Sequence, residues 1–189
     1  MQPKRTRKFL SAARAVSLRR RWARKGLRVV FTNGVFDLLH AGHVEMLEKA
    51  ARLGERLVVG LNTDASAGRL EKKAPPRPIN ALKDRARVLG ALECVDAVVP
   101  FGEDTPEPLL SRLRPDILVK GADYRPEQVA GRRHAGRVVL IALKRGYSTT
   151  ALLRRIRRSG RSRPVREGRC KSPRKKYNPL YRTRGTRTQ

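Results

Sequence analysis

Short apolar runs rich in β-branched residues alternate with longer amphipathic segments through the middle of the chain. Runs of this kind, bounded by turn residues, predict strands at residues 27–32, 56–61, 96–101, 116–120 and 137–142. Apolar positions spaced three to four apart predict helices at residues 42–53, 80–92, 106–113 and 148–158. The alternation favours an α/β, Rossmann-like fold, in which one domain holds an open parallel five-stranded sheet with helices on both faces.

Charge sets the two ends of the chain apart from this middle part. The 189 residues include 45 Lys or Arg and 16 Asp or Glu, so the net charge is +29. Residues 1–25 hold ten of the basic residues and no acid, while residues 159–189 hold eleven against the single Glu167. We therefore predict three parts: a basic N-terminal segment with a helix (1–25), a globular domain (26–158) and a basic, disordered tail (159–189).

Several protein classes do not fit this composition. The two cysteines, Cys94 and Cys170, form neither a disulfide framework nor the spacing of a zinc site. No apolar run reaches the roughly 18–20 residues that a membrane-spanning helix needs. The basic N-terminus lacks the apolar core of a secretory signal. We expect a cytoplasmic protein without a membrane span.

The segment after the first predicted strand carries the strongest candidate chemistry. Residues 33–43 read NGVFDLLHAGH and place His40 and His43 three residues apart, close to a predicted helix start. A helix N-terminus offers unpaired amides and the positive end of the helix dipole, which suit phosphate groups. Gly34 and Gly42 allow the backbone to approach a ligand closely. Because ligands of open parallel sheets bind beyond the carboxyl ends of the strands, we expect a phosphate site here.

Simpler interpretations of the two histidines stay open at this point. A histidine at a helix start is often only a cap or a surface residue, and a pair three apart can also bind a metal. However, no glutamate follows in the HExxH manner, and His134 is the only other histidine. The P-loop, GxGxxG and GxSxG patterns are all absent. The sequence therefore points to phosphate chemistry without a Walker loop or a covalent nucleophile.

Two motifs give the chain a family resemblance. Residues 34–43 (GVFDLLHAGH) resemble the GxFDxxHxGH signature of the cytidylyltransferase-like, or HxGH, nucleotidyltransferases, and residues 146–153 (GYSTTALL) are similar to their GxSTTxLI segment. Within this family, about residues 11–157 look like the D-glycero-β-D-manno-heptose 1-phosphate adenylyltransferase domain of ADP-heptose synthesis. The segments that carry this narrower likeness are residues 30–34, 58–66, 77–79, 84–85, 94–101 and 119–124.

The resemblance implies a specific reaction. AMP would pass from ATP to D-glycero-β-D-manno-heptose 1-phosphate, giving pyrophosphate and ADP-heptose, a precursor of the lipopolysaccharide core. Mg²⁺ would arrive with ATP, held by the nucleotide and water, so no metal site made by the protein is expected. The length leaves no room for the sugar kinase often fused to this domain, so a stand-alone form is expected. A homodimer is a further expectation of the resemblance.

The resemblance also assigns roles to individual residues. His40 and His43 would be catalytic and would hydrogen-bond the phosphates of the nucleotide. The other expected nucleotide-binding residues are Thr32, Asn33, Gly34, Phe36, Lys120, Gly121, Ser148, Thr149 and Thr150. The expected substrate-binding residues are Asp37, Asn62, Asp64, Arg77 and Asp123. For Asp37, the residues alone also allow a structural role, in which the carboxylate holds its own loop through backbone hydrogen bonds.

Two other functions remain open on the sequence. The segment 71–76 is longer and more basic than in the family, and 131–136 is shorter and lacks an acidic position, so another acceptor such as glycerol 3-phosphate with CTP fits the same fold. The charge of +29 would also suit a nucleic-acid-binding protein that kept an enzyme fold. No nucleic-acid motif is found, so we favour non-specific adhesion of nucleic acid to the basic ends.

Overall fold

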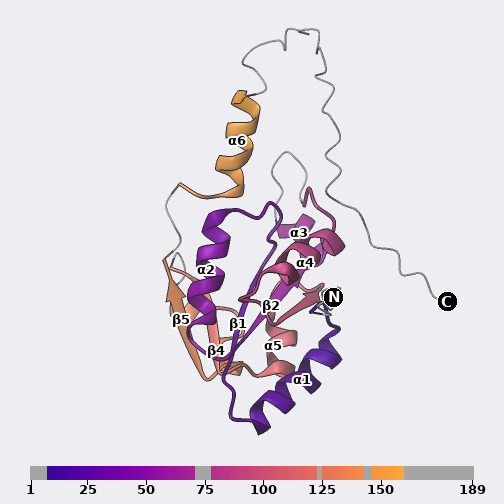
Figure 1. Ribbon diagram of the computed structural model, residues 1–189, viewed down its shortest axis with the longest axis vertical. Helices are drawn as coiled ribbons and strands as arrows, with labels where there is room; N and C mark the ends of the chain where they lie inside the picture. The colour runs from indigo at the N-terminus through magenta and orange to yellow at the C-terminus, as the bar shows by residue number, and fades with distance from the viewer. Residues whose placement is uncertain (1–7, 71–77, 123–124, 143–145, 160–189) are drawn as a thin grey trace, which may run out of the picture.

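The computed structural model describes residues 8–70, 78–122, 125–142 and 146–159 (Figure 1). Its five strands are β1 (Val29–Gly34), β2 (Arg56–Asn62), β3 (Ala97–Phe101), β4 (Ile117–Gly121) and β5 (Arg137–Ile141). Its helices are α1 (Ala12–Arg24), α2 (Ala41–Ala51), α3 (Asp64–Leu70), α4 (Leu82–Ala91), α5 (Glu107–Leu113) and α6 (Thr149–Ser159), with 3-10 turns η1 (Pro126–Gln128) and η2 (Arg132–His134). All strand pairs are parallel and the order is β3-β2-β1-β4-β5, which confirms the predicted fold class.

Helices cover both faces of the sheet because successive strand residues point to opposite sides. Val29 and Phe31 of β1 pack in one core cluster with residues of α1 and α5. Val30, between them, packs in the other cluster with residues of α2 and α4. The strands therefore bury apolar side chains on both faces, which explains why they read as continuous apolar runs. Two cores of this kind hold the sheet rigid and so fix the loops at its edge.

The N-terminal residues take part in the fold. The backbone of residues 8–10 pairs with the outer edge of β3: the Leu10 amide donates to the Val98 carbonyl at 2.9 Å and the Val98 amide donates to the Lys8 carbonyl at 2.7 Å. After this pairing, α1 packs against α5 and β3 and buries Ala15. Residues 160–189 lie outside the described part of the chain, so the three-part division of the sequence stays a prediction.

One helix was not expected from the sequence. The sequence pattern predicts no helix between the strand at 56–61 and the helix at 80–92, whereas α3 runs from Asp64 to Leu70. Seven residues span fewer than two helical turns, which is too short for an apolar period to be recognised. A side-chain cap gives the local reason for the helix, since the Ser66 amide donates to the Thr63 hydroxyl at 3.3 Å.

The strands separate at one point of the sheet. The β1–β2 ladder continues to the pair Gly34–Leu61, but the β1–β4 ladder ends at Phe31–Leu118. Strand order reverses between β1 and β4, so this is the topological switch point of the sheet. The carboxyl ends of β1 and β4 are therefore unpaired with each other, where ligands of open α/β sheets bind.

The helices give no indication of a membrane span. Within the described ranges, no helix combines the length and apolarity required to cross a bilayer.

Candidate active site at the switch point

The two motif histidines stack at the start of α2. His40 is the N-cap, in extended conformation, and its Nδ1 accepts a hydrogen bond from the His43 amide at 3.3 Å. The two imidazole rings lie 3.8 Å apart between centroids and 14° from parallel. The Phe36 ring meets the His43 ring in an edge arrangement at 5.2 Å. The sequence prediction that His43 lies near a helix start is confirmed, and each ring has a fixed orientation.

Burial keeps both histidines neutral at physiological pH. Removal from solvent lowers the pKa of His43 to about 4, with a smaller contribution from the charge of the adjacent His40. Burial also lowers the pKa of His40, against a hydrogen bond that raises it. Because Nδ1 of His40 accepts a hydrogen bond, the proton of its neutral ring resides on Nε2. The pair therefore offers N–H donors without a fixed charge.

Two buried polar atoms at the site lack partners. Within the described residues, neither Oδ1 of Asn33 nor Nδ1 of His43 has a hydrogen bond. Buried groups without partners are rare in native proteins and occur where a water or ligand completes a site. Both atoms belong to the segment that follows the switch point, so they support its assignment as a binding site.

The loop between β1 and α2 is held by Asp37. Phe36 has a φ of 46°, in the left-handed region, so the chain turns sharply just before this carboxylate. The buried Asp37 side chain accepts hydrogen bonds at 2.9 Å from the backbone amides of Ile79 and Asn80. The Asn80 side chain donates in return to the Asp37 carbonyl at 2.9 Å. The structural role considered for Asp37 is thus present, and its contact with substrate stays a prediction.

A buried arginine joins this loop to the neighbouring strand. Arg85 of α4 is 2% exposed and its guanidinium has several acceptors. They are the carbonyls of Val35 (2.5 Å), Asn62 (2.9 Å) and Asn80 (2.9 Å) and the carboxylate of Asp64 (2.6 Å). Val35 follows β1 and Asn62 ends β2. Asp64 begins α3, and Asn80 precedes α4. One cation therefore holds four segments of the site in a single arrangement.

Two of the expected substrate residues make structural contacts. The side-chain amide of Asn62 donates to the Ser66 hydroxyl at 2.8 Å, and that hydroxyl donates to the Glu103 carbonyl at 2.9 Å. Asp64 accepts from Arg85 and, at 3.2 Å, from the Leu82 amide, while half of its side-chain surface remains exposed. Their contact with substrate stays a prediction, and the exposed Asp64 carboxylate keeps room for it.

The expected nucleotide-binding residues come from three elements. Residues 32–34 end β1 and residues 120–121 end β4, on either side of the switch point. Ser148 caps α6, since its hydroxyl accepts from the Ala151 amide at 3.0 Å. Thr149 and Thr150 form the first turn of that helix. The residues therefore occur where the carboxyl ends of strands and a helix N-terminus provide phosphate-binding groups.

The two sequence motifs meet in space. Tyr147, just before α6, lies with its ring 6.3 Å from that of His40. A Cβ added to Gly42 would lie 2.8 Å from the Cβ of Tyr147, so only glycine permits this approach. The beginning of α6 and the beginning of α2 are thus neighbours, although about a hundred residues separate them. Figure 1 shows α6 above the N-terminal end of α2.

Some expected site residues cannot be placed. Arg77 and Asp123 lie outside the described residues. In the described ranges, no group of three or more His, Cys, Asp or Glu side chains could hold a metal ion. The expectation that Mg²⁺ arrives with the nucleotide stays a prediction.

Comparison with known proteins assigns the chain to a family. The pattern of the Cytidylyltransferase-like family matches residues 31–155, which include both motifs. The chain belongs to this family. It is therefore a nucleotidyltransferase, as its two motifs predict.

Curated relatives agree with this assignment. The bifunctional protein HldE of Gluconacetobacter diazotrophicus is 55% identical over 159 residues, which cover 82% of this chain and 32% of the relative. The bifunctional protein HldE of Magnetococcus marinus is 61% identical over 140 residues, 72% of this chain and 28% of that protein. The chain thus spans about a third of the length of the curated relatives it matches.

A solved structure shares the fold. The lipopolysaccharide core biosynthesis protein from Thermoplasma volcanium GSS1 aligns with a TM-score of 0.54 and 27% sequence identity. The alignment covers 63% of this chain and 99% of that protein. The shared fold thus extends over nearly all of that chain and about two thirds of the present one.

Sequence reasoning gave no role to Arg85 or Tyr147. Arg85 was noted only as part of the family likeness. A signal for its burial was present, because Arg85 falls on the apolar stripe formed by Leu82, Ala86 and Leu89 in α4. Tyr147 carried no such signal, since its contact with His40 depends on the tertiary fold.

Replacing Arg85 tests the arrangement of the loops. Arg85→Met should lower the free energy of unfolding by about 3–5 kcal/mol, because Asp64 and three carbonyls lose their shared donor. Arg87→Met, two positions away on the exposed side of α4, should change it by less than about 0.5 kcal/mol. Chemical denaturation of both variants measures the difference. Equal effects would show that Arg85 does not hold these segments.

Histidine titration tests the neutral pair. In the unliganded protein, the His43 ring should titrate by NMR near pH 4 and that of His40 below the ordinary 6.5. Because the unfolded chain binds these protons first, the free energy of unfolding should fall as the pH drops from about 6.5 to about 4. Added ATP should raise both pKa values, since the phosphates are anionic. An ordinary value near 6.5 for His43 would contradict its burial.

Proposed function

We propose that the chain is a D-glycero-β-D-manno-heptose 1-phosphate adenylyltransferase. It would transfer AMP from ATP to the sugar 1-phosphate and release pyrophosphate, giving ADP-heptose for the lipopolysaccharide core. The observation that carries the proposal is the meeting of the HxGH and STT motifs beside the switch point of the sheet. The likeness of residues 30–34, 58–66 and 119–124 to the heptose enzymes supports this acceptor. The need of the proposed reaction for ATP is consistent with a cytoplasmic location.

The reaction is an in-line displacement at phosphorus. An oxygen of the sugar phosphate forms a bond to the α-phosphorus of ATP, the bond to the bridging β-phosphate oxygen breaks, and pyrophosphate leaves. The attacking oxygen is already anionic and needs no strong general base. Catalysis then depends on alignment and on stabilising the charge that builds on the α-phosphate and on the leaving group.

His40 and His43 provide this stabilisation. Their neutral rings donate N–H hydrogen bonds to phosphate oxygens in a site with little water, where such bonds are strong. The stacked rings are 3.8 Å apart, so protonation of both would place two like charges close together, and the pair gains positive charge only when phosphates compensate it. The N-terminal amides of α2 contribute further donors and the positive end of the helix dipole. The histidine pair thus responds to charge on the ligand.

The remaining phosphates would be bound by the start of α6. Its first amides and the hydroxyls of Ser148, Thr149 and Thr150 suit the β- and γ-phosphates, and Tyr147 connects this turn to His40. Asn33, Gly34 and Lys120 would contact the nucleotide between β1 and β4. Mg²⁺ bound to the triphosphate would neutralise part of its charge. The homodimer expected from the family likeness stays a prediction.

A substrate panel tests the proposal. Pyrophosphate release should occur with Mg-ATP and D-glycero-β-D-manno-heptose 1-phosphate, and should be at least about a hundredfold slower with Mg-CTP and glycerol 3-phosphate. The loops around Asn62 and Asp64, which these residues hold through internal hydrogen bonds, would provide this discrimination. Release with the second pair alone would assign the chain to another acceptor. Chelation of Mg²⁺ by EDTA should abolish release in either case.

Histidine substitutions test the mechanism. His43→Ala should lower kcat by at least about a hundredfold, because a donor to the reacting phosphate is lost. His134→Ala is the matched control: His134 lies in η2 beside Glu107, away from both motifs, and its loss should change kcat by less than about twofold. Circular dichroism checks that both variants are folded. Near-complete activity of His43→Ala would remove His43 from the catalytic machinery.

A further inference from the structure

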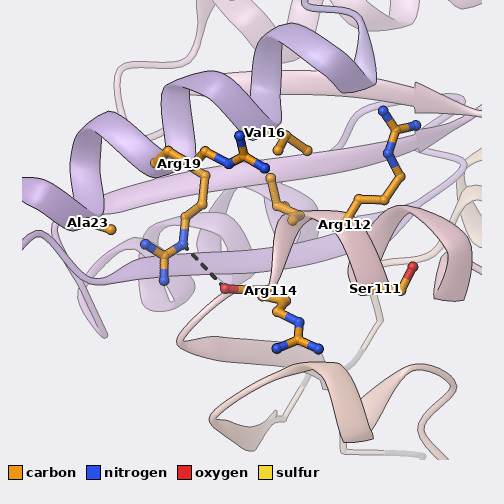
Figure 2. A pocket seen from close by; sticks show the side chains of 8 residues that line it. Val16, Arg19, Ala23, Ser111, Arg112 and Arg114 are labelled. Atoms are coloured by element: carbon orange, nitrogen blue, oxygen red, sulfur yellow. Dashed lines mark hydrogen bonds between the residues drawn. The ribbon is translucent and has the colours of Figure 1, made fainter.

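A basic hollow lies between α1 and α5, far from the histidine pair. Its volume is about 550 Å³, and its lining residues are Val16, Arg19, Arg20, Ala23, Ser111, Arg112, Leu113 and Arg114. Figure 2 shows side chains of α1 on one wall and those at the end of α5 on the other. Arg114 precedes β4, so the hollow lies toward the amino ends of the strands, whereas His40 follows the carboxyl end of β1.

One of the four arginines is structural and holds the walls together. Arg19 is mostly buried and donates to the Asp116 carboxylate at 3.0 Å and to the Arg114 carbonyl at 3.3 Å, the bond drawn in Figure 2. Asp116 in turn accepts from the Val29 amide at 2.6 Å. The distance between α1 and the end of α5 is therefore fixed through β1, and the hollow is a permanent feature of the fold.

The other three arginines carry uncompensated charge. Arg20, Arg112 and Arg114 are exposed, and none has an ion pair or hydrogen bond from its side chain within the described residues. The nearby acids are already engaged: Asp116 pairs with Arg19, and Glu107 pairs with Arg133. The sequence from residue 1 to 36 contains no acid at all. Three exposed arginines without an acidic partner thus border the hollow.

We propose that this hollow is a sequence-independent binding site for the phosphate backbone of nucleic acid. It differs from adhesion by the basic ends, because its residues belong to the folded domain. It is also independent of the proposed transferase function, since it involves none of the residues assigned to that site.

The chemistry of the walls favours a polymer with repeated phosphates. An exposed ion pair contributes only about 0–1 kcal/mol, so one small anion would bind weakly to these arginines. Several phosphates of one chain can contact all three and release their counterions together. Arg14, Arg21 and Arg24, which also belong to α1, increase the positive potential of this helix further. A nucleic-acid strand is therefore a better match than a free phosphate.

The shape and lining distinguish nucleic acid from a membrane or a protein. The site is concave, whereas a bilayer surface favours a projecting apolar side chain. The apolar lining consists of Val16, Ala23 and the buried Leu113, without the aromatic anchors typical of a protein interface. The same lack of aromatic lining excludes base stacking in the hollow, so contacts would be made to phosphates and would not read sequence.

The test compares two triple variants of the full chain. The hollow variant combines Arg20→Gln, Arg112→Gln and Arg114→Gln. The control variant combines Arg52→Gln, Lys83→Gln and Arg87→Gln, which removes the same charge from exposed positions elsewhere. Fluorescence anisotropy with a labelled RNA of about 20 nucleotides is measured between about 50 and 200 mM KCl. Pyrophosphate release should match the wild type in both, which controls for folding.

The hollow variant should weaken RNA binding by about tenfold or more. The slope of log Kd against log salt should fall by about two, since each lost phosphate contact removes about 0.7 for a single strand. The control variant should differ from wild type by less than about threefold. Equal losses in the two variants would overturn the proposal in favour of net charge alone. Unchanged RNA binding by the hollow variant, with lost binding to phosphatidylglycerol vesicles, would overturn it in favour of a membrane surface.

Discussion

The buried guanidinium of Arg85 is the interaction on which the geometry of the active site depends. A charge at this depth is tolerated only when every donor is matched, and the acceptors come from four separate segments. Each of these segments leads into or out of the site. Together with Asp37, which holds the amides of residues 79 and 80, Arg85 converts loops into a fixed frame. The strained turn at Phe36 is stable because this frame surrounds it.

The frame places the two motif histidines at a helix terminus inside a partly apolar environment. Their pKa values are lowered by burial, so the unliganded histidine pair carries no permanent positive charge, unlike a Walker-type lysine. In the proposed mechanism, the dipole of α2 and the amides of α6 would supply electrostatic stabilisation that does not depend on protonation. In this mechanism the backbone amides are constant donors, whereas the charge of the imidazoles depends on the bound ligand.

The sequence predicted the parallel sheet and five of the six helices in the described ranges, because each strand is apolar on both faces and each of those helices has a clear period. It predicted the positions of His40 and His43 and of residues 148–150 at helix starts, because each motif is a continuous stretch of sequence. The contact between Tyr147 and Gly42 was beyond prediction, since nothing in either segment indicates the other. The same holds for the early end of the β1–β4 ladder at Phe31. Such features arise from packing between distant segments. The burial of Arg85, by contrast, could be predicted from the sequence, because Arg85 is a charged residue on the apolar stripe of α4.

Besides its charge, the N-terminal segment has a structural role, because residues 8–10 pair with the outer edge of β3. An unpaired strand edge is a template for association with other chains, and here the protein's own backbone occupies it. Lys8 adds a side-chain bond to the Leu92 carbonyl at 2.9 Å, which anchors the covering segment. Removal of residues 1–7 would therefore reduce charge and leave the edge closed, whereas removal through Leu10 would expose it to self-association. Any shortened form of the protein that is meant to isolate electrostatic effects has to begin no later than Lys8.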